Sequence, residues 1–240
     1  MDVPSTQAIK ASSVFSRELM VIVFWVAIVL VVPSVVASGI WEIIMTMTTI
    51  GNIDENTKIS IISIFAFPFV FLFLIQIPKA NNLETVKKYY SIKPINLQVL
   101  AYCIVVAILY YAAIELFSYY IKVPSETFMD ELRIQMSSKL GAICIILSIC
   151  VCAPILEECL FRGLLYNYFI KTRLSVVGAV IIPSLVFSAI HLQYGSLFTF
   201  VTLFFGGILL GVVRCKTQNL LYPMIVHSIY NIFTLIGLFY

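Results

Sequence analysis

Long apolar runs without a single charge are the feature that most limits how this chain can fold. Residues 19–41, 174–213 and 217–240 contain no Asp, Glu, Lys or Arg. A membrane-spanning helix needs about 20 consecutive, mainly apolar residues, so the longest of these runs is long enough for two spans. We therefore expect an all-α protein, a polytopic membrane helical bundle with about seven transmembrane helices. Residues 1–240 should form a single integral membrane domain.

The overall composition agrees with lipid as the main solvent. Of the 240 residues, 61% are hydrophobic and 11% are charged, whereas soluble domains usually carry about 25% charged residues. The net charge of +3 is small, and no compact basic patch accompanies it, so we expect no nucleic-acid partner. The composition makes the lipid bilayer an expected partner.

The distribution of Lys and Arg predicts the orientation of the chain. With seven spans, ten basic residues fall on the side of the N-terminus and four on the opposite side. Cytoplasmic loops carry an excess of basic residues, so we expect a cytoplasmic N-terminus and an extracytoplasmic C-terminus. The first apolar run is too long for a typical signal-peptide core and is read as a permanent helix. We expect a multi-pass protein of the plasma membrane.

Charged residues also predict where the later spans begin and end. The segments they delimit are 58–79, 93–122, 139–171, two spans within 173–214, and one after 216. We expect a turn at residues 193–196 and a short surface helix in the loop 122–139. Gly207 and Gly211 form a G-x-x-x-G pattern, which allows two helices to approach closely, here most simply within one chain.

Polar residues within these spans are candidates for function, because lipid disfavours ionisable groups. They gather late in the chain, at Glu157, Glu158, Arg162, His191, His227 and Asn231. Arg162 lies four residues after Glu158, so the two side chains share a helix face and can pair. Glu157 projects elsewhere. His227 and Asn231 have the same spacing of four.

Each of these residues also has a purely structural interpretation. An intramembrane Glu–Arg pair often supports packing, a single His can bond a neighbouring helix, and Glu115 reads as a lone buried or snorkelling acid. Together these polar residues are stronger evidence for a functional site than any one of them, because they come from three different spans. With a rise of about 1.5 Å per residue, Glu157 and His191 reach similar depths only if one long helix continues to Ile170. A helix that ended at Leu156 would place them at opposite faces.

The polar residues belong to three motifs that resemble the CPBP family, which includes CAAX prenyl endopeptidases, bacteriocin-processing enzymes and "Abi" membrane proteins. The family pattern is E-E-x-x-x-R, then F-x-x-x-H, then H-x-x-x-[ND]. In this chain the motifs read EECLFR at 157–162, FSAIH at 187–191 and HSIYN at 227–231. The resemblance covers the motif-bearing core, residues 140–240.

The resemblance implies an intramembrane glutamate protease. In the family the first Glu and the first His activate water, which implies that Glu157 is the general base and that His191 orients the water. The second His and the Asn stabilise the oxyanion, which implies that role for His227 and Asn231. We expect these four catalytic side chains to converge on one cavity.

Glu158 and Arg162 would brace the site in the same interpretation. A competing interpretation makes Glu157, His191 and His227 ligands of a zinc ion with one open position. The chain has no H-E-x-x-H helix, and the family is associated with a metal-free mechanism. We therefore expect no cofactor and no metal.

The predicted function is an endopeptidase that hydrolyses a peptide bond in a membrane-associated protein or peptide. The resemblance implies prenylated CAAX proteins, bacteriocin or pheromone precursors, or membrane proteins as substrates, and the sequence does not choose among them. The alternative is a non-proteolytic membrane regulator or immunity protein that binds another membrane protein, such as a sensor kinase. A transporter is disfavoured because the polar residues form one cluster, not a continuous path.

Overall fold

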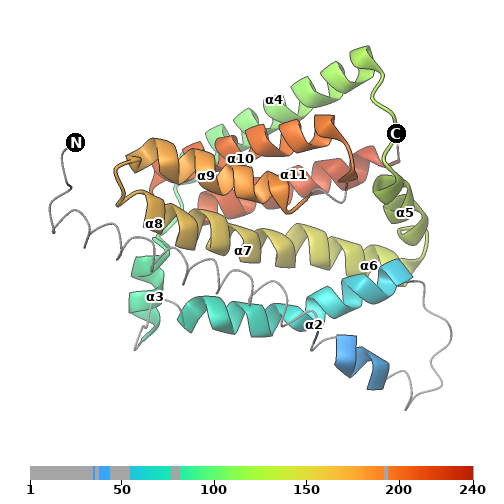
Figure 1. Ribbon diagram of the computed structural model, residues 1–240, viewed down its shortest axis with the longest axis horizontal. Coiled ribbons are helices and arrows are strands. Elements are labelled where there is room, and N and C mark those ends of the chain that lie inside the picture. Colours follow the sequence, from blue (N-terminus) through green and yellow to red (C-terminus); the bar gives the residue numbers. More distant parts are fainter. Residues whose placement is uncertain (1–34, 36–37, 44–54, 77–81, 192–193, 240) are drawn as a thin grey trace, which may run out of the picture.

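The described part of the chain is built from helices, without a strand (Figure 1). The computed structural model describes residues 35, 38–43, 55–76, 82–191 and 194–239. The principal helices are α2 (Glu55–Gln76), α3 (Leu83–Tyr89), α4 (Leu97–Ile121), α5 (Thr127–Gln135), α6 (Lys139–Leu147), α7 (Ala153–Glu158), α8 (Tyr166–Phe169), α9 (Ser175–Ala189), α10 (Leu197–Thr217) and α11 (Leu221–Gly237). The expected all-α membrane bundle is confirmed. Most of the first predicted span, residues 19–41, lies outside the described residues.

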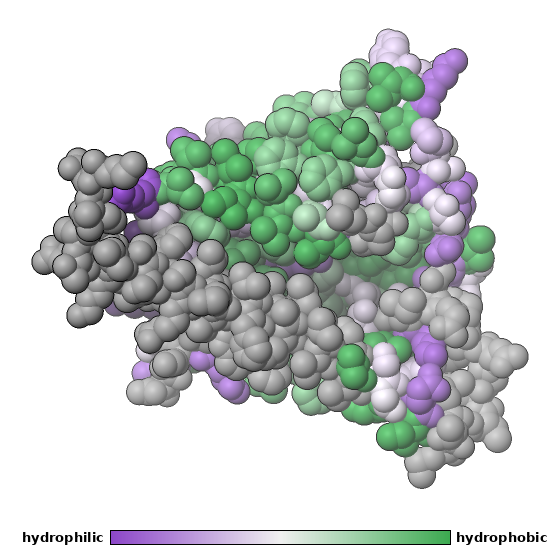
Figure 2. Space-filling model, viewed as in Figure 1, coloured by the Kyte–Doolittle hydropathy of each residue, from purple (hydrophilic) through white to green (hydrophobic). Residues whose placement is uncertain are grey.

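Three helical stretches within the described residues are long and apolar enough to cross a membrane. They are α4, the continuous stretch Lys139–Phe169, and α10. Shorter apolar helices accompany them at Ser60–Gln76, α9 and α11. Figure 2 shows apolar side chains over much of the visible face, with hydrophilic ones gathered at its two ends. This distribution suits a bundle that lies in lipid and meets water at both ends.

The stretch Lys139–Phe169 crosses the centre of the bundle, with α2 on one side and α9 and α11 on the other (Figure 1). It is one continuous helix with two wide π-helical segments, η1 (Ser148–Cys152) and η2 (Cys159–Leu165). Pro154 is the second residue after η1, and proline lacks the N–H that an ordinary helical turn requires. The expectation of one long helix through Glu157 is confirmed.

Local capping explains several helix starts. The Asn96 side chain accepts hydrogen bonds from the first backbone N–H groups of α4, and Ser138 does the same for α6. Ser196 caps α10 through the N–H of Thr199, after Gly195 with its φ of 70°. The expected turn therefore precedes α10, and α5 is the expected surface helix. The short helix α3, capped by Asn82, was not predicted.

The G-x-x-x-G pattern joins α10 to α9 of the same chain, as expected. A Cβ atom added to Gly207 would lie 2.9 Å from Cβ of Ser184, and one added to Gly211 would lie 3.0 Å from Cγ1 of Val180. Both glycines therefore permit a close approach that a larger residue would prevent. This contact fixes α9, the helix that leads to His191, against α10.

Asn219 ties the turn between α10 and α11 to the segment before α4. Its buried side chain donates to the carbonyl of Lys93 at 2.9 Å, and its Oδ1 accepts from the Lys93 N–H at 3.3 Å. Oδ1 also accepts from the N–H of Leu221 at 3.2 Å, at the first residue of α11. Asn219 therefore helps to set where α11 begins.

Candidate active site

A buried ion pair lies at the centre of the polar cluster. Arg162 Nη1 donates to Glu158 Oε1 at 2.9 Å, with side-chain exposures of 1% and 0%. Arg162 Nη2 donates to the carbonyl of Gly207 on α10 at 2.8 Å, and the guanidinium lies 5.1 Å from the centre of the Phe187 ring. The predicted pairing of Glu158 with Arg162 is confirmed. The pair also connects the central helix to α9 and α10.

His227 on α11 lies between the two neighbouring carboxylates of the central helix. Its Nδ1 is 2.9 Å from Glu158 Oε1, and its Nε2 is 3.7 Å from Glu157 Oε2. A carboxylate only accepts hydrogen bonds, so Nδ1 must carry a proton. The Nε2 separation is longer than a hydrogen bond. Glu158 is shared by Arg162 and His227, whereas Glu157 remains 21% exposed and free of the arginine.

His191 lies in the turn that follows α9, not in the helix itself, because α9 ends at Ala189. Its Nδ1 is 2.7 Å from the carbonyl of Phe187. A carbonyl cannot donate, so this contact places the proton on Nδ1 and makes Nε2 the acceptor of a neutral ring. The Phe187 ring contacts both histidines, with centroid separations of 4.7 Å to His191 and 5.8 Å to His227.

Tyr194 is a residue of this neighbourhood that the sequence analysis treated only as part of a turn. Its ring stacks on the His191 ring with a centroid separation of 6.1 Å and an interplanar angle of 12°. It also packs edge to face against Phe128 of α5, with a centroid separation of 5.0 Å. Burial, with the nearby carboxylates of Glu157 and Glu126, raises the pKa of Tyr194 to about 12, so the phenol stays protonated at neutral pH. No local pattern identifies this position.

Asn231 lies one turn beyond His227 on α11. Its Nδ2 donates to the carbonyl of Ile149, within the wide segment η1, at 2.8 Å. The η2 segment is held in a similar way, since Nε of the buried Arg214 donates to the carbonyl of Arg162 at 3.2 Å. Arg214 served only as a span boundary in the sequence analysis. Its position at the end of an apolar run gave no sign of burial.

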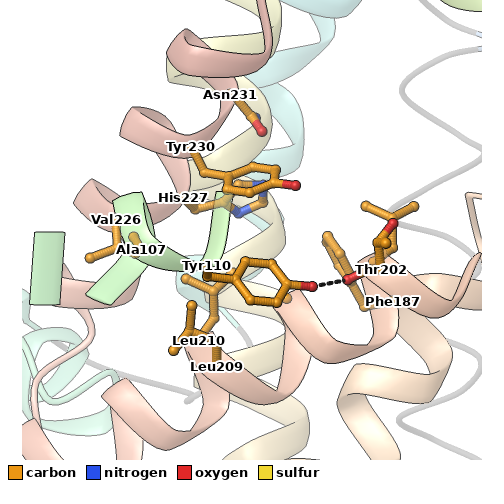
Figure 3. A pocket seen from close by; sticks show the side chains of 12 residues that line it. Ala107, Tyr110, Phe187, Thr202, Leu209, Leu210, Val226, His227, Tyr230 and Asn231 are labelled. Atoms are coloured by element: carbon orange, nitrogen blue, oxygen red, sulfur yellow. Dashed lines mark hydrogen bonds between the residues drawn. The ribbon is translucent and has the colours of Figure 1, made fainter. Parts of the chain in front are cut away.

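The expected convergence of the four catalytic side chains on one cavity stays a prediction, and two cavities among the described residues are each bordered by members of this set. A cavity of about 50 Å³ between α4, α9, α10 and α11 is bordered by His227 and Asn231 (Figure 3). A second cavity, of about 220 Å³, lies between α2, α7 and α9 and is bordered by Glu157. Neither cavity is bordered by His191.

The remaining predicted features have less to do with the cluster. Glu115 is exposed on α4, beside a surface depression that it shares with Lys122. In the described ranges, no three His, Cys, Asp or Glu side chains are grouped so that they could hold a metal ion. Glu157 and His227 provide only part of a zinc shell. The expectation that the chemistry needs no metal stays a prediction.

A protein-family model matches the part of the chain that carries the three motifs. Residues 139–233 match the family model described as type II CAAX prenyl endopeptidase Rce1-like. A stretch of 119 residues is 34% identical to an "Uncharacterized 24.3 kDa protein" of Escherichia coli, covering 49% of this chain and 54% of that protein. The chain thus spans about half the length of this curated relative. No solved structure matches.

Proposed function

Because residues 139–233 belong to the Rce1-like branch of the CPBP family, we propose that the protein is an intramembrane endopeptidase of the glutamate type. Water activated by Glu157 and His191 hydrolyses a peptide bond in a membrane-associated protein or peptide. The proposed reaction uses no cofactor and no metal. Bacteriocin or other peptide precursors and prenylated proteins are the substrate classes within this proposal.

The observation that carries the proposal is the unequal environment of the two adjacent carboxylates. Glu158 is fully buried and is shared by Arg162 and His227. Glu157 is partly exposed, borders a cavity and lies opposite Nε2 of His227. A general base must be able to meet water and must not be held by a permanent cation. Glu157 meets both conditions, and Glu158 meets neither.

The ring nitrogens of the two histidines suit different tasks. His191 has its proton on Nδ1, toward the Phe187 carbonyl, so a neutral ring offers Nε2 as the acceptor that orients water. His227 also has its proton on Nδ1, toward Glu158. It acts as an oxyanion donor when a second proton occupies Nε2.

Asn231 is the second proposed oxyanion donor. One N–H of its amide is used by the carbonyl of Ile149, and a primary amide has a second N–H. Asn231 borders the same cavity as His227, which supports the assignment of both side chains as donors to one oxygen. An oxyanion donor in such a site is typically worth about 3–4 kcal/mol of transition-state stabilisation.

The bonds in the proposed reaction balance without a further reactant. The water oxygen attacks the peptide carbonyl carbon, and Glu157 takes one water proton as the carbonyl oxygen gains negative charge near His227 and Asn231. The tetrahedral intermediate then collapses and the C–N bond breaks. Glu157 returns its proton to the leaving nitrogen, which gives a carboxylic acid and an amine.

The proposal is tested with Glu157→Gln, which keeps the shape of the side chain and removes the proton acceptor. Loss of general-base catalysis should lower activity about 10²–10⁴-fold. The measurement is the profile of new peptide termini in membranes from a deletion strain that expresses either form at equal abundance. Glu115→Gln is the matched control, since it neutralises an acid on the exposed face of α4 and should leave the profile intact.

Two outcomes would contradict the proposal. If Glu157→Gln produced the same cleaved termini as the unchanged protein, Glu157 would not be the base. If no termini depended on the protein, yet Glu157→Gln rescued the phenotype of the deletion, the non-proteolytic regulator or immunity protein would be the better description. Losses with His191→Ala as large as those with Glu157→Gln would support the shared activation of water.

A further inference from the structure

Three polar side chains occupy one face of α11. His227, Tyr230 and Asn231 are separated by three and four positions, and residues with this spacing lie on the same side of a helix. All three border the cavity of about 50 Å³ between α4, α9, α10 and α11. Figure 3 shows their side chains extending from α11 toward the same side. Tyr230 is the member of this face without a role in the proposed reaction.

The other hydroxyl groups in the wall of this cavity are already occupied. The Tyr110 hydroxyl donates to the carbonyl of Thr202 at 2.6 Å, and the Thr202 hydroxyl donates to the carbonyl of Thr199 at 3.0 Å. A hydroxyl has one proton to donate. Tyr230 differs, because its hydroxyl makes no hydrogen bond with any of the described residues. Its proton is therefore the one in the cavity wall's hydroxyl groups that a ligand can accept.

The ring of Tyr230 is held by two tyrosines of α4. It packs edge to face against the Tyr111 ring, with a centroid separation of 5.6 Å, and lies 6.2 Å from the Tyr110 ring. A phenylalanine could make the same ring contacts, so packing explains the ring and not the hydroxyl. A ring fixed on two sides holds its hydroxyl in one direction, as a preorganised hydrogen-bond donor requires.

The two other proposed donors on this face are each restricted in a way that Tyr230 is not. His227 has its proton on Nδ1, toward Glu158, so it donates from Nε2 only when the ring carries a second proton. Asn231 uses one of its two N–H groups for the carbonyl of Ile149. A tyrosine hydroxyl is neutral and a donor in its ordinary state, so Tyr230 can donate without a change of protonation.

We propose that the Tyr230 hydroxyl is a third donor to the oxyanion, beside His227 and Asn231. The inference rests on the proposed endopeptidase function and adds a catalytic residue to it. One water oxygen needs roughly 10–15 Å³, so the cavity of about 50 Å³ has room for the reacting carbonyl oxygen. As this oxygen gains negative charge, the phenol donates a hydrogen bond to it and keeps its own proton.

The test is Tyr230→Phe, which removes the hydroxyl and keeps the ring. The full-length protein in proteoliposomes is given an internally quenched peptide that spans a bond identified by the assay of new peptide termini, and kcat and KM are measured separately. Loss of one oxyanion donor should lower kcat by about 10²–10³-fold and leave KM unchanged, because the donor acts only in the transition state. The unfolding temperature in detergent should not change, since the folded protein loses no hydrogen bond.

Tyr111→Phe is the matched control from the same group of rings. Its hydroxyl donates to the carbonyl of Phe233 at 3.2 Å and lies outside the cavity wall, so its loss should lower the unfolding temperature and leave kcat unchanged. An unchanged kcat in Tyr230→Phe, a rise in KM alone, or a lost kcat with a lower unfolding temperature would each overturn the third donor. Cleavage that still depended on Glu157 would then leave the endopeptidase function standing. Cleavage by the unchanged protein no faster than by Glu157→Gln would overturn both.

Discussion

At the scale of single residues, the spacing of Glu158 and Arg162 predicted their ion pair because both lie on one helix, and the pair has a testable consequence. Arg162→Ala should destabilise the protein as well as lower its activity. The contact of His227 with both carboxylates, in contrast, was not predictable from spacing. It depends on the rotation of α11 relative to α7, and no periodicity within either segment encodes that rotation. The same limit explains why Tyr194 was missed, since its stacking on His191 arises only from the fold of the turn.

Arg162→Ala should lower the stability for a specific reason. The substitution leaves Glu158 as a buried carboxylate without its cation, which typically costs about 3–5 kcal/mol. It also removes the hydrogen bond to the Gly207 carbonyl. The measurement is thermal unfolding in detergent, with the exposed Arg173→Ala as the control. Full stability with lost activity would instead indicate that Arg162 contacts the substrate.

At the scale of helices, boundaries were predictable where charged residues or capping side chains mark them. The extents of α4 and α10 follow from such signals, and α5 was expected in its loop. The wide segments η1 and η2 were not predicted, because their sequences, SICVC and CLFRGLL, carry no pattern that distinguishes a π-helical turn from an α-helical one. Their positions depend on Pro154 and on side chains from α10 and α11, which lie far away in the sequence.

Asn219→Ala should destabilise the protein by loosening the start of α11. The change removes three hydrogen bonds of a buried amide, two to Lys93 and one to Leu221. At about 0.5–1.5 kcal/mol for each bond, the expected loss of unfolding free energy is about 2–4 kcal/mol. Denaturation in detergent measures this loss. The neighbouring Gln218→Ala, at an exposed position, should have little effect, and equal losses in both variants would contradict the assignment.

At the scale of the whole molecule, the membrane bundle was predictable because lipid imposes a strong constraint on composition. A span needs both apolar length and internally paired backbone groups, and long uncharged runs satisfy both requirements together. The orientation of the bundle rests on the distribution of basic residues alone. The contacts within the described residues are the same for either orientation.

A reporter fused after Tyr240 should lie outside the cytoplasm. The expectation follows from the ten-to-four excess of Lys and Arg on the side of the N-terminus, given seven spans. Alkaline phosphatase activity with little fluorescence from a cytoplasm-dependent protein would support it. A second fusion after Lys93, between the predicted second and third spans, should give the opposite result. A cytoplasmic signal from both fusions would mean that the number of spans after Lys93 is even.

The wide segment η1 is a place where the length of the central helix can change by one residue. A π-helical turn closes through i→i+5 hydrogen bonds and so holds one residue more than an α-helical turn. Deleting one residue between Ser148 and Cys152 would let the segment close into ordinary α-helical turns, with little rotation of the half that carries Glu157. Related chains should therefore show single-residue gaps in this segment, whereas a gap in an α-helical stretch would rotate one half of the helix against the other by about 100°.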